Sequence, residues 1–134
     1  MSKIRIGLLT VLALITTTFG TATIRQTNLV PASAKDIMCL ARNIYHEAGY
    51  EPFEGKVAVA QVTMNRVTAG RFGKDVCGVV YKRDNILGNI VCQFSWACTN
   101  VTKVKPVYPG LWKESEEVAK KVLLENFRLP SMKD

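Results

Sequence analysis

Apolar side chains recur every three to four residues in three stretches of the chain, which is the spacing of an amphipathic helix. The first helix is expected over residues 37–48, with Asp36 as its N-cap. The second, over residues 56–67, is apolar around most of its circumference, so we expect a central buried helix that ends at Gly70. The third is expected over residues 111–127.

Two short runs between the second and third helices have strand character. Val76–Tyr81 is rich in β-branched residues, and Ile90–Phe94 is similar. Turn-forming residues at 83–85 and at 88–89 lie between them. The pattern predicts a small antiparallel hairpin in an α+β domain that is mainly helical, without repeats or low-complexity segments after the leader.

The N-terminal segment of the chain has the features of an export signal. Lys3 and Arg5 precede an uncharged apolar run over residues 6–24, and small residues allow cleavage after Ala22, with a second small-x-small site at 32–34. We therefore expect an exported protein of the periplasm, the cell wall or the extracellular space.

The same run is about as long as a minimal membrane span. Retention as a weak anchor, with transient membrane contact through residues 4–24, stays open, as in phage lysins with releasable anchors. The predicted domain division is a leader and linker over residues 1–34 and a single domain over residues 35–134.

The chain carries 18 Lys and Arg against 11 Asp and Glu, a net charge of +7. Residues 1–34 hold three of the basic side chains and no acidic one, so residues 35–134 keep 15 basic and 11 acidic side chains and stay basic. A basic exported domain suits an anionic surface such as peptidoglycan. Nucleic acid is not expected as a partner, because the lysines are scattered rather than interleaved with aromatic residues. We expect a monomer.

Four cysteines follow the leader: Cys39, Cys77, Cys92 and Cys98. An even number in an oxidising compartment favours two disulfides, which can pair in three ways. We favour Cys77 with Cys92, between neighbouring strands, and Cys39 with Cys98. A zinc site is the competing use, although no spacing is C-x-x-C and His46 is the single histidine. No metal or cofactor is expected.

Glu47 is the candidate general acid. It lies about 80° from the centre of the first helix's apolar stripe, and Glu51 and Glu54 follow in the next turn. Partial burial and neighbouring like charges both raise the pKa of a carboxyl group, so a half-sheltered glutamate here could donate a proton. Cys39 and His46 are expected on the opposite, polar side of the helix. Alternatively, Glu47 is solvated and merely flanks the core.

Eight segments carry a resemblance that covers about residues 37–98. They are Leu40–Ala48, Glu51-Pro52, Glu54-Gly55, Val57–Ala60, Asn65–Val67, Val76-Cys77, Val80-Tyr81 and Cys92–Trp96. In this order they resemble the SleB/CwlJ-type cell-wall hydrolases, which include spore cortex-lytic enzymes and related phage and proteobacterial proteins. The resemblance implies a small lysozyme-like or lytic-transglycosylase-like domain that cleaves the glycan strands of peptidoglycan.

The resemblance also implies roles for individual residues. Glu47 would act as the single catalytic acid and base, protonating the glycosidic oxygen and then taking a proton from the muramic 6-hydroxyl. The residues implied in substrate binding are Glu51, Gln93, Ser95, Tyr45 and Trp96. Gln93 and Ser95 could instead pair with backbone groups at a strand end. Tyr45 and Trp96 could instead belong to the core.

The chain departs from the family pattern in two places. The family usually has Ala-Arg-Gly-Glu where this chain has Ala48–Glu51, so a basic side chain beside the catalytic turn is missing. Family domains also commonly continue beyond the third helix, whereas this chain stops soon after Leu129. We therefore expect a truncated domain with an incomplete groove and marginal stability or activity.

Two rival functions stay open. His46-Glu47 begins like the metalloprotease motif H-E-x-x-H, but position 50 is Tyr50 and the chain has no other histidine. A secreted wall-binding protein without catalytic activity, or an inactive hydrolase fragment, is the second rival. Within the glycosidase interpretation, transglycosylation and muramidase-type hydrolysis are both possible.

Overall fold

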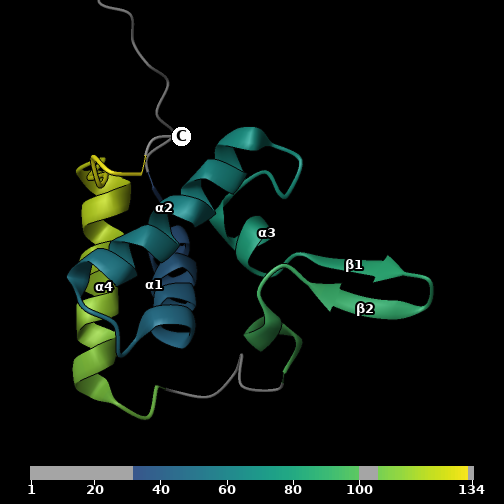
Figure 1. Cartoon of the computed structure of the whole chain (residues 1–134), viewed down its shortest axis with the longest axis horizontal. Coiled ribbons are helices and arrows are strands. Elements are labelled where there is room, and N and C mark those ends of the chain that lie inside the picture. The colour runs from purple at the N-terminus through teal and green to yellow at the C-terminus, as the bar shows by residue number, and fades with distance from the viewer. Residues whose placement is uncertain (1–31, 100–105, 133–134) are drawn as a thin grey trace, which may run out of the picture.

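A computed structural model describes residues 32–99 and 106–132 of the chain, so most of the expected leader lies outside it. It confirms a mainly helical α+β fold (Figure 1). The elements are α1 (Ala34–Ala48), α2 (Phe53–Ala69), α3 (Val76–Val80), β1 (Arg83–Ile86), β2 (Asn89–Cys92), a 3₁₀-helix η1 (Ser95–Cys98) and α4 (Pro109–Leu124). Within the described ranges, no helix is both long enough and apolar enough to cross a bilayer.

Helix α1 begins earlier than the apolar pattern predicts. Its N-cap is Ser33, whose hydroxyl accepts a hydrogen bond from the backbone N–H of Asp36 at 3.1 Å. The Asp36 carboxylate in turn accepts from the backbone N–H of Ser33 at 3.2 Å. The expected cap at Asp36 is therefore wrong, because Asp36 is the fourth residue of a capping box that Ser33 opens.

The run expected as the first strand is the short helix α3. Asp75 caps it, and its carboxylate accepts a hydrogen bond from the backbone N–H of Gly78 at 2.6 Å. Val79 and Val80 are fully buried in the core. Burial against other helices and a side-chain cap outweigh the strand preference of β-branched residues over so short a segment.

A hairpin does form, but from β1 and β2. The strands pair antiparallel, with Arg83 opposite Cys92 and Ile86 opposite Asn89. Leu87 and Gly88 both have positive φ, 52° and 84°, as a two-residue hairpin turn requires. The hairpin extends away from the helices (Figure 1). The second predicted strand is thus nearly right, while the observed first strand includes residues 83–85, which were expected to form the turn.

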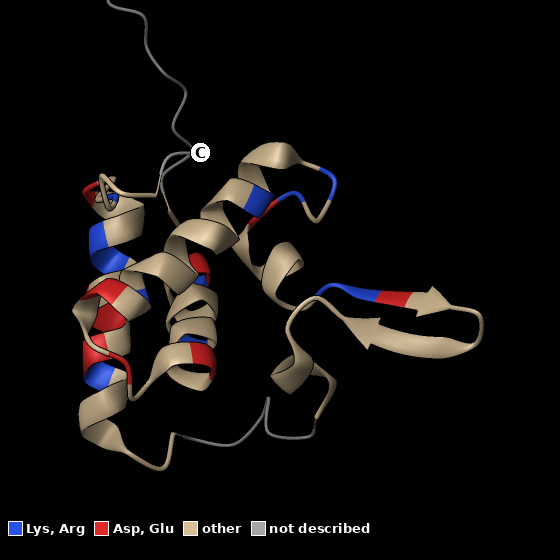
Figure 2. Cartoon of the chain, in the orientation of Figure 1, with Lys and Arg blue, Asp and Glu red and all other residues tan. Residues whose placement is uncertain are grey.

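Basic and acidic positions are spread over the described helices rather than gathered on one face (Figure 2). This distribution agrees with the scattered lysines noted in the sequence.

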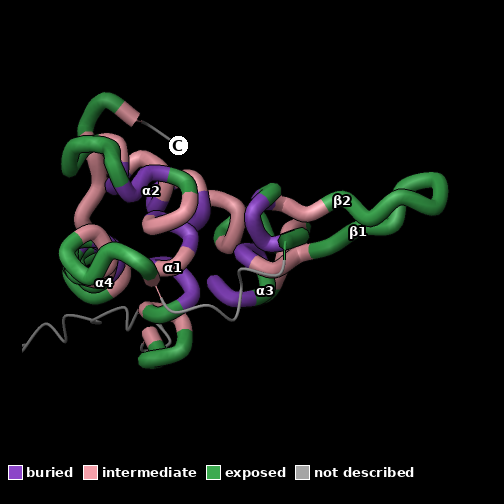
Figure 3. Tube along the Cα trace, turned by 90° about the horizontal axis from the view of Figure 1, so that it is seen from below, coloured by how far each residue is buried: buried purple, intermediate pink, exposed green. Residues whose placement is uncertain are grey.

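The core lies where α1, α2, α3 and α4 meet (Figure 3). Leu40 and Ile44 of α1 are fully buried, together with Val57 of α2 and Val122 of α4. Helix α2 packs against α1, α3 and α4, but α1 contacts the other helices more extensively and most of α2 is only partly buried, so the expectation that α2 is the central buried helix is wrong. Gly70 ends it with φ of 72°, and its N–H donates to the carbonyl of Val67, which confirms the predicted left-handed cap. The expected third helix is α4, which begins two residues earlier and ends three residues earlier than predicted.

Two disulfides are present, but the favoured pairing is wrong. Cys39 of α1 pairs with Cys77 of α3, and Cys92 pairs with Cys98 across the segment that follows the hairpin. Cys77 lies on a helix packed against α1, so it is not beside Cys92. Cys39 is buried, and its expected place on the polar side of α1 is also wrong. Among the described residues, no group of histidine, cysteine, aspartate and glutamate is gathered as a metal site.

Candidate active site

Glu47 lies in the last turn of α1 and borders a cleft of about 390 Å³. We call this space the Glu47 cleft. Arg66 of α2 and Gln93 and Ser95, which follow β2, also line it. Ser95 is exposed, and Arg66 and Gln93 are half-buried. The fold therefore brings the expected acid together with two of the expected hydrogen-bonding residues.

The carboxylate of Glu47 is more exposed than the helical pattern predicts. It is exposed rather than half-sheltered, although the α2 side chains of Ala58, Val59 and Val62 line the same cleft. Glu47 nevertheless borders a concave space, so it is not an isolated residue on an open surface. Burial alone does not provide the shelter that the sequence suggested.

A buried chain of hydrogen bonds sets the walls of the Glu47 cleft. Asn43 lies one turn before Glu47 and is fully buried. Its side-chain amide donates to the Thr63 hydroxyl of α2 at 3.1 Å, and its amide oxygen accepts from the indole N–H of Trp96 at 2.8 Å. Because a buried polar group without a partner is costly, these bonds hold α1, α2 and the segment that carries Gln93 and Ser95 in one arrangement.

Trp96 is therefore a core residue, and its expected role as a surface for sugar stacking is not supported by its position. The residue is 8% exposed. The His46 ring stacks on it, with centroids 4.4 Å apart. The Tyr81 ring meets it edge-on at 5.7 Å. His46 does not simply face solvent on the polar side of α1, as the sequence suggested, since it packs on this core indole.

The environment of His46 favours its neutral form. Burial lowers the pKa of its imidazole, and the positive charge of Arg42 lowers that pKa further. A neutral ring stacks on Trp96 without placing a charge against the core. His46 acts in the structure as a packing residue beside the Glu47 cleft.

Glu47 also lines a second pocket of about 320 Å³, whose other lining residues differ from those of the cleft. Glu51 and three tyrosines, Tyr45, Tyr50 and Tyr108, line it together with Glu47, and we call it the tyrosine pocket. The Tyr45 hydroxyl accepts a hydrogen bond from the backbone N–H of Tyr108 at 3.2 Å. Glu51 and Tyr45 thus lie near Glu47, but not in the cleft that contains Gln93 and Ser95.

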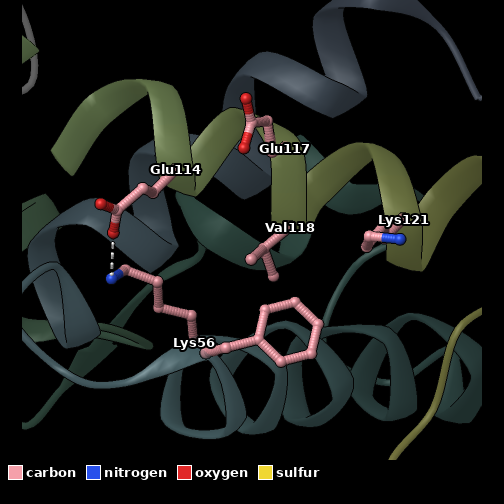
Figure 4. Close-up of a pocket in the computed structure, with 6 residues that line it drawn as sticks. Lys56, Glu114, Glu117, Val118 and Lys121 are labelled. Carbon is pink, nitrogen blue, oxygen red and sulfur yellow. Dashed lines mark hydrogen bonds and ion pairs between the residues drawn. The ribbon is translucent and has the colours of Figure 1, made fainter. Parts of the chain in front are cut away.

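A third pocket lies between α2 and α4, on residues that do not include Glu47 (Figure 4). The side chain of Lys56 is 5% exposed there and pairs with Glu114 at 2.8 Å. Its ammonium also donates to the backbone carbonyl of Glu51 at 2.8 Å. This lysine therefore ties the turn that carries Glu51 to α4, a structural role that the sequence did not suggest.

A family model described as Cell Wall Hydrolase matches residues 50–132, which is more than half of the chain. The chain belongs to this family. The matched range includes Arg66, Gln93 and Ser95 and begins just after Glu47. The resemblance drawn from the sequence motifs is confirmed at the level of the family.

Curated relatives support the same assignment. The chain is 44% identical over 50 residues to the spore cortex-lytic enzyme of Bacillus subtilis (strain 168), covering 37% of this chain and 16% of that protein. It is 41% identical over 63 residues to the spore cortex-lytic enzyme of Halalkalibacterium halodurans, covering 46% of this chain and 19% of that protein. The chain thus spans less than a fifth of the length of these relatives. No solved structure matches it.

Sequence reasoning missed several residues of the site. Arg66 was not among the residues expected in the site, yet it lines the Glu47 cleft, with its guanidinium 4.9 Å from the centroid of the Phe94 ring. Asn43 could have been recognised from the sequence, because it places an amide side chain one helical turn before Glu47. Tyr108 carried no such signal, because it joins the site only through the packing of α4 against α1.

Proposed function

We propose that this member of the cell wall hydrolase family cleaves the glycan strands of peptidoglycan, with Glu47 as the general acid. The observation that carries the proposal is the Glu47 cleft. A carboxylate on one wall faces a concave space whose other lining residues include Gln93 and Ser95. Such an arrangement can hold sugar hydroxyl and acetamido groups while the acid reaches a glycosidic oxygen.

The composition of the cleft favours chemistry with one carboxylate. Among the described residues that line it, Glu47 is the single acidic side chain, and Glu51 lines the tyrosine pocket instead. Most glycosidases use a pair of carboxyl groups that flank the scissile bond. Lytic transglycosylation needs one, because the muramic 6-hydroxyl attacks and Glu47 can take up its proton after donating its own.

Lytic transglycosylation by Glu47 would consume no water. Glu47 gives its proton to the leaving glycosidic oxygen as the bond to the muramic C1 breaks. The 6-hydroxyl oxygen then bonds to C1, and its proton returns to the Glu47 carboxylate. The product would carry an anhydro-muramic end, and Gln93, Ser95 and Arg66 would position the ring during the reaction.

Export of the protein forms part of this proposal. Disulfides persist in oxidising compartments, where peptidoglycan is also found, and the chain has two of them. The predicted leader over residues 1–34 and the predicted monomeric state stay predictions.

Mass spectrometry of digested sacculi tests the reaction. The full chain is expected to release muropeptides that are one water lighter than hydrolysis products. Glu47→Gln is expected to lower the rate by about 10²–10⁴-fold, the range in which general acid catalysis operates. Glu54→Gln is the matched control, since this exposed glutamate in the first turn of α2 lines neither pocket near Glu47.

Three results would change the proposal. A reducing muramic end would replace transglycosylation by hydrolysis. Unchanged release by the Glu47→Gln variant would remove Glu47 as the acid. Binding of the wild-type chain to sacculi without release of any fragment would favour the wall-binding alternative.

A further inference from the structure

Two exposed tyrosines form a pair beside Glu47. Tyr50 follows α1 and is 78% exposed, while Tyr108 caps α4 and is 53% exposed. Their rings meet edge-on, with centroids 5.8 Å apart. Such large exposed rings add little to the core, so their pairing has no evident structural purpose.

The pair is held in place rather than loosely exposed. The backbone N–H of Tyr108 donates to the hydroxyl of Tyr45, which is half-buried and meets the Trp112 ring at 6.0 Å. Interaction with the Tyr108 side chain raises the pKa of the Tyr50 hydroxyl above its usual value. Preorganised rings lose little conformational entropy when a ligand binds.

The shape of the tyrosine pocket suits one sugar ring. Its volume is about 320 Å³, at the small end of the range for ligand sites. Tyrosine offers an apolar ring face and a polar hydroxyl, which match the C–H face and the hydroxyl groups of a pyranose. The carboxylates of Glu47 and Glu51 line the same pocket and can accept hydrogen bonds from sugar hydroxyls.

The charge of the tyrosine pocket favours the glycan strand of peptidoglycan over its stem peptide. Among the described residues that line it there are two glutamates and no lysine or arginine. His46 also lines it, and its lowered pKa favours the neutral form. A carboxylate-bearing stem peptide would be repelled there, whereas a neutral glycan would not.

We propose that Tyr50 and Tyr108 form a glycan subsite that binds an N-acetylhexosamine ring next to the scissile linkage. The inference rests on the proposed function, because the same strand would cross Glu47 from the Glu47 cleft into the tyrosine pocket. Binding on both sides of the acid places the glycosidic oxygen between them. The tyrosine pair acts as a binding element and takes no part in proton transfer.

Calorimetric titration with a β-1,4-linked tetramer of N-acetylglucosamine tests the subsite on the full chain. Tyr50→Ala and Tyr108→Ala are each expected to weaken binding up to about tenfold, the effect of losing one aromatic contact. Tyr50→Phe keeps the ring and is expected to stay within about twofold of wild type. Phe53→Ala removes an exposed ring from the pocket between α2 and α4 and serves as the control.

Several results would overturn the subsite. These are unchanged tetramer binding by the double variant Tyr50→Ala/Tyr108→Ala, no binding by the wild-type chain at millimolar concentration, or an equal loss in the Phe53→Ala control. A double variant that loses affinity for a free stem peptide, but not for the tetramer, would assign the surface to peptide instead. Circular dichroism confirms that each variant is folded.

The binding test of the tyrosine subsite is independent of the assignment of Glu47 as the general acid. If Glu47→Gln cleaves sacculi at the wild-type rate while the tyrosine variants lose tetramer binding, the acid is wrong and the subsite stands. If Glu47→Gln is inactive and the tyrosine variants bind normally, the acid stands and the subsite is wrong.

Discussion

The two disulfides are expected to serve different purposes, and removing them separately makes the difference measurable. Cys39 and Cys77 are 38 residues apart and join α1 to α3 in the core. Cys92 and Cys98 are 6 residues apart and close the segment that carries Gln93 and Ser95. The perturbations are the double variants Cys39→Ala/Cys77→Ala and Cys92→Ala/Cys98→Ala.

The loop lengths set the expected loss of stability. A bridge constrains the unfolded chain more when it closes a longer loop, which gives about 4 kcal/mol for the 38-residue separation and about 2 kcal/mol for the 6-residue one. For a domain of this size, a loss of about 2 kcal/mol lowers the melting temperature by about 10 °C, and about 4 kcal/mol lowers it by about 20 °C.

The expected loss of function runs in the opposite order. Without its bridge, the segment from Cys92 to Cys98 keeps the Trp96–Asn43 hydrogen bond, but Gln93 is less firmly placed at the Glu47 cleft. The Cys92→Ala/Cys98→Ala variant should therefore release fragments from sacculi at least about tenfold more slowly, since small misplacements in a site lower rates steeply. The other double variant should keep its rate at temperatures well below its melting point.

Melting curves followed by circular dichroism and rates of sacculus digestion at 15 °C give both quantities. A folded Cys92→Ala/Cys98→Ala variant with wild-type activity would refute the reasoning, as would a larger loss of stability from that pair than from the core pair. Mild reduction offers a second measurement. Cys98 is exposed whereas Cys39 and Cys77 are buried, so the shorter bridge should be reduced first.

Two further predictions follow from the described residues. Asn43→Ala leaves the indole N–H of Trp96 buried without its partner, so the free energy of unfolding in urea should fall by about 2–4 kcal/mol, and a change below about 0.5 kcal/mol would contradict the buried network. His46 has a lowered pKa in the folded state, so the unfolded chain binds more protons; its contribution to stability should be complete above the unfolded pKa near 6.5 and decrease as the pH falls through the lowered folded value. His46→Gln should flatten that part of the stability profile, and an unchanged slope would contradict the assignment.

The helices and their caps were largely predictable, because they depend on local patterns. Periodic apolar residues predict α1, α2 and α4, and Gly70 ends α2 as expected. The α3 segment was not predictable in this way. Its valines favour a strand locally, and only packing against α1, with the bridge between Cys39 and Cys77, makes it a helix.

The residues of the candidate site were likewise predictable only in part. Glu47, Gln93 and Ser95 could be named from motif residues that resemble a known family, and the fold brings them to one cleft. Arg66 and Tyr108 could not, since their neighbours in the site are distant in sequence and arrive only through helix packing. For Trp96 the sequence left a substrate-binding role and a place in the core both open, and the tertiary structure buries it.

The sequence by itself determined the family, the main helices and the identity of the candidate acid, because these depend on residue types at short spacing. Only the tertiary structure decided the disulfide partners, the exposure of Glu47 and the tyrosine pair at its side. Those features depend on which helix faces meet, and burial of apolar surface across the whole domain selects that arrangement rather than any local pattern.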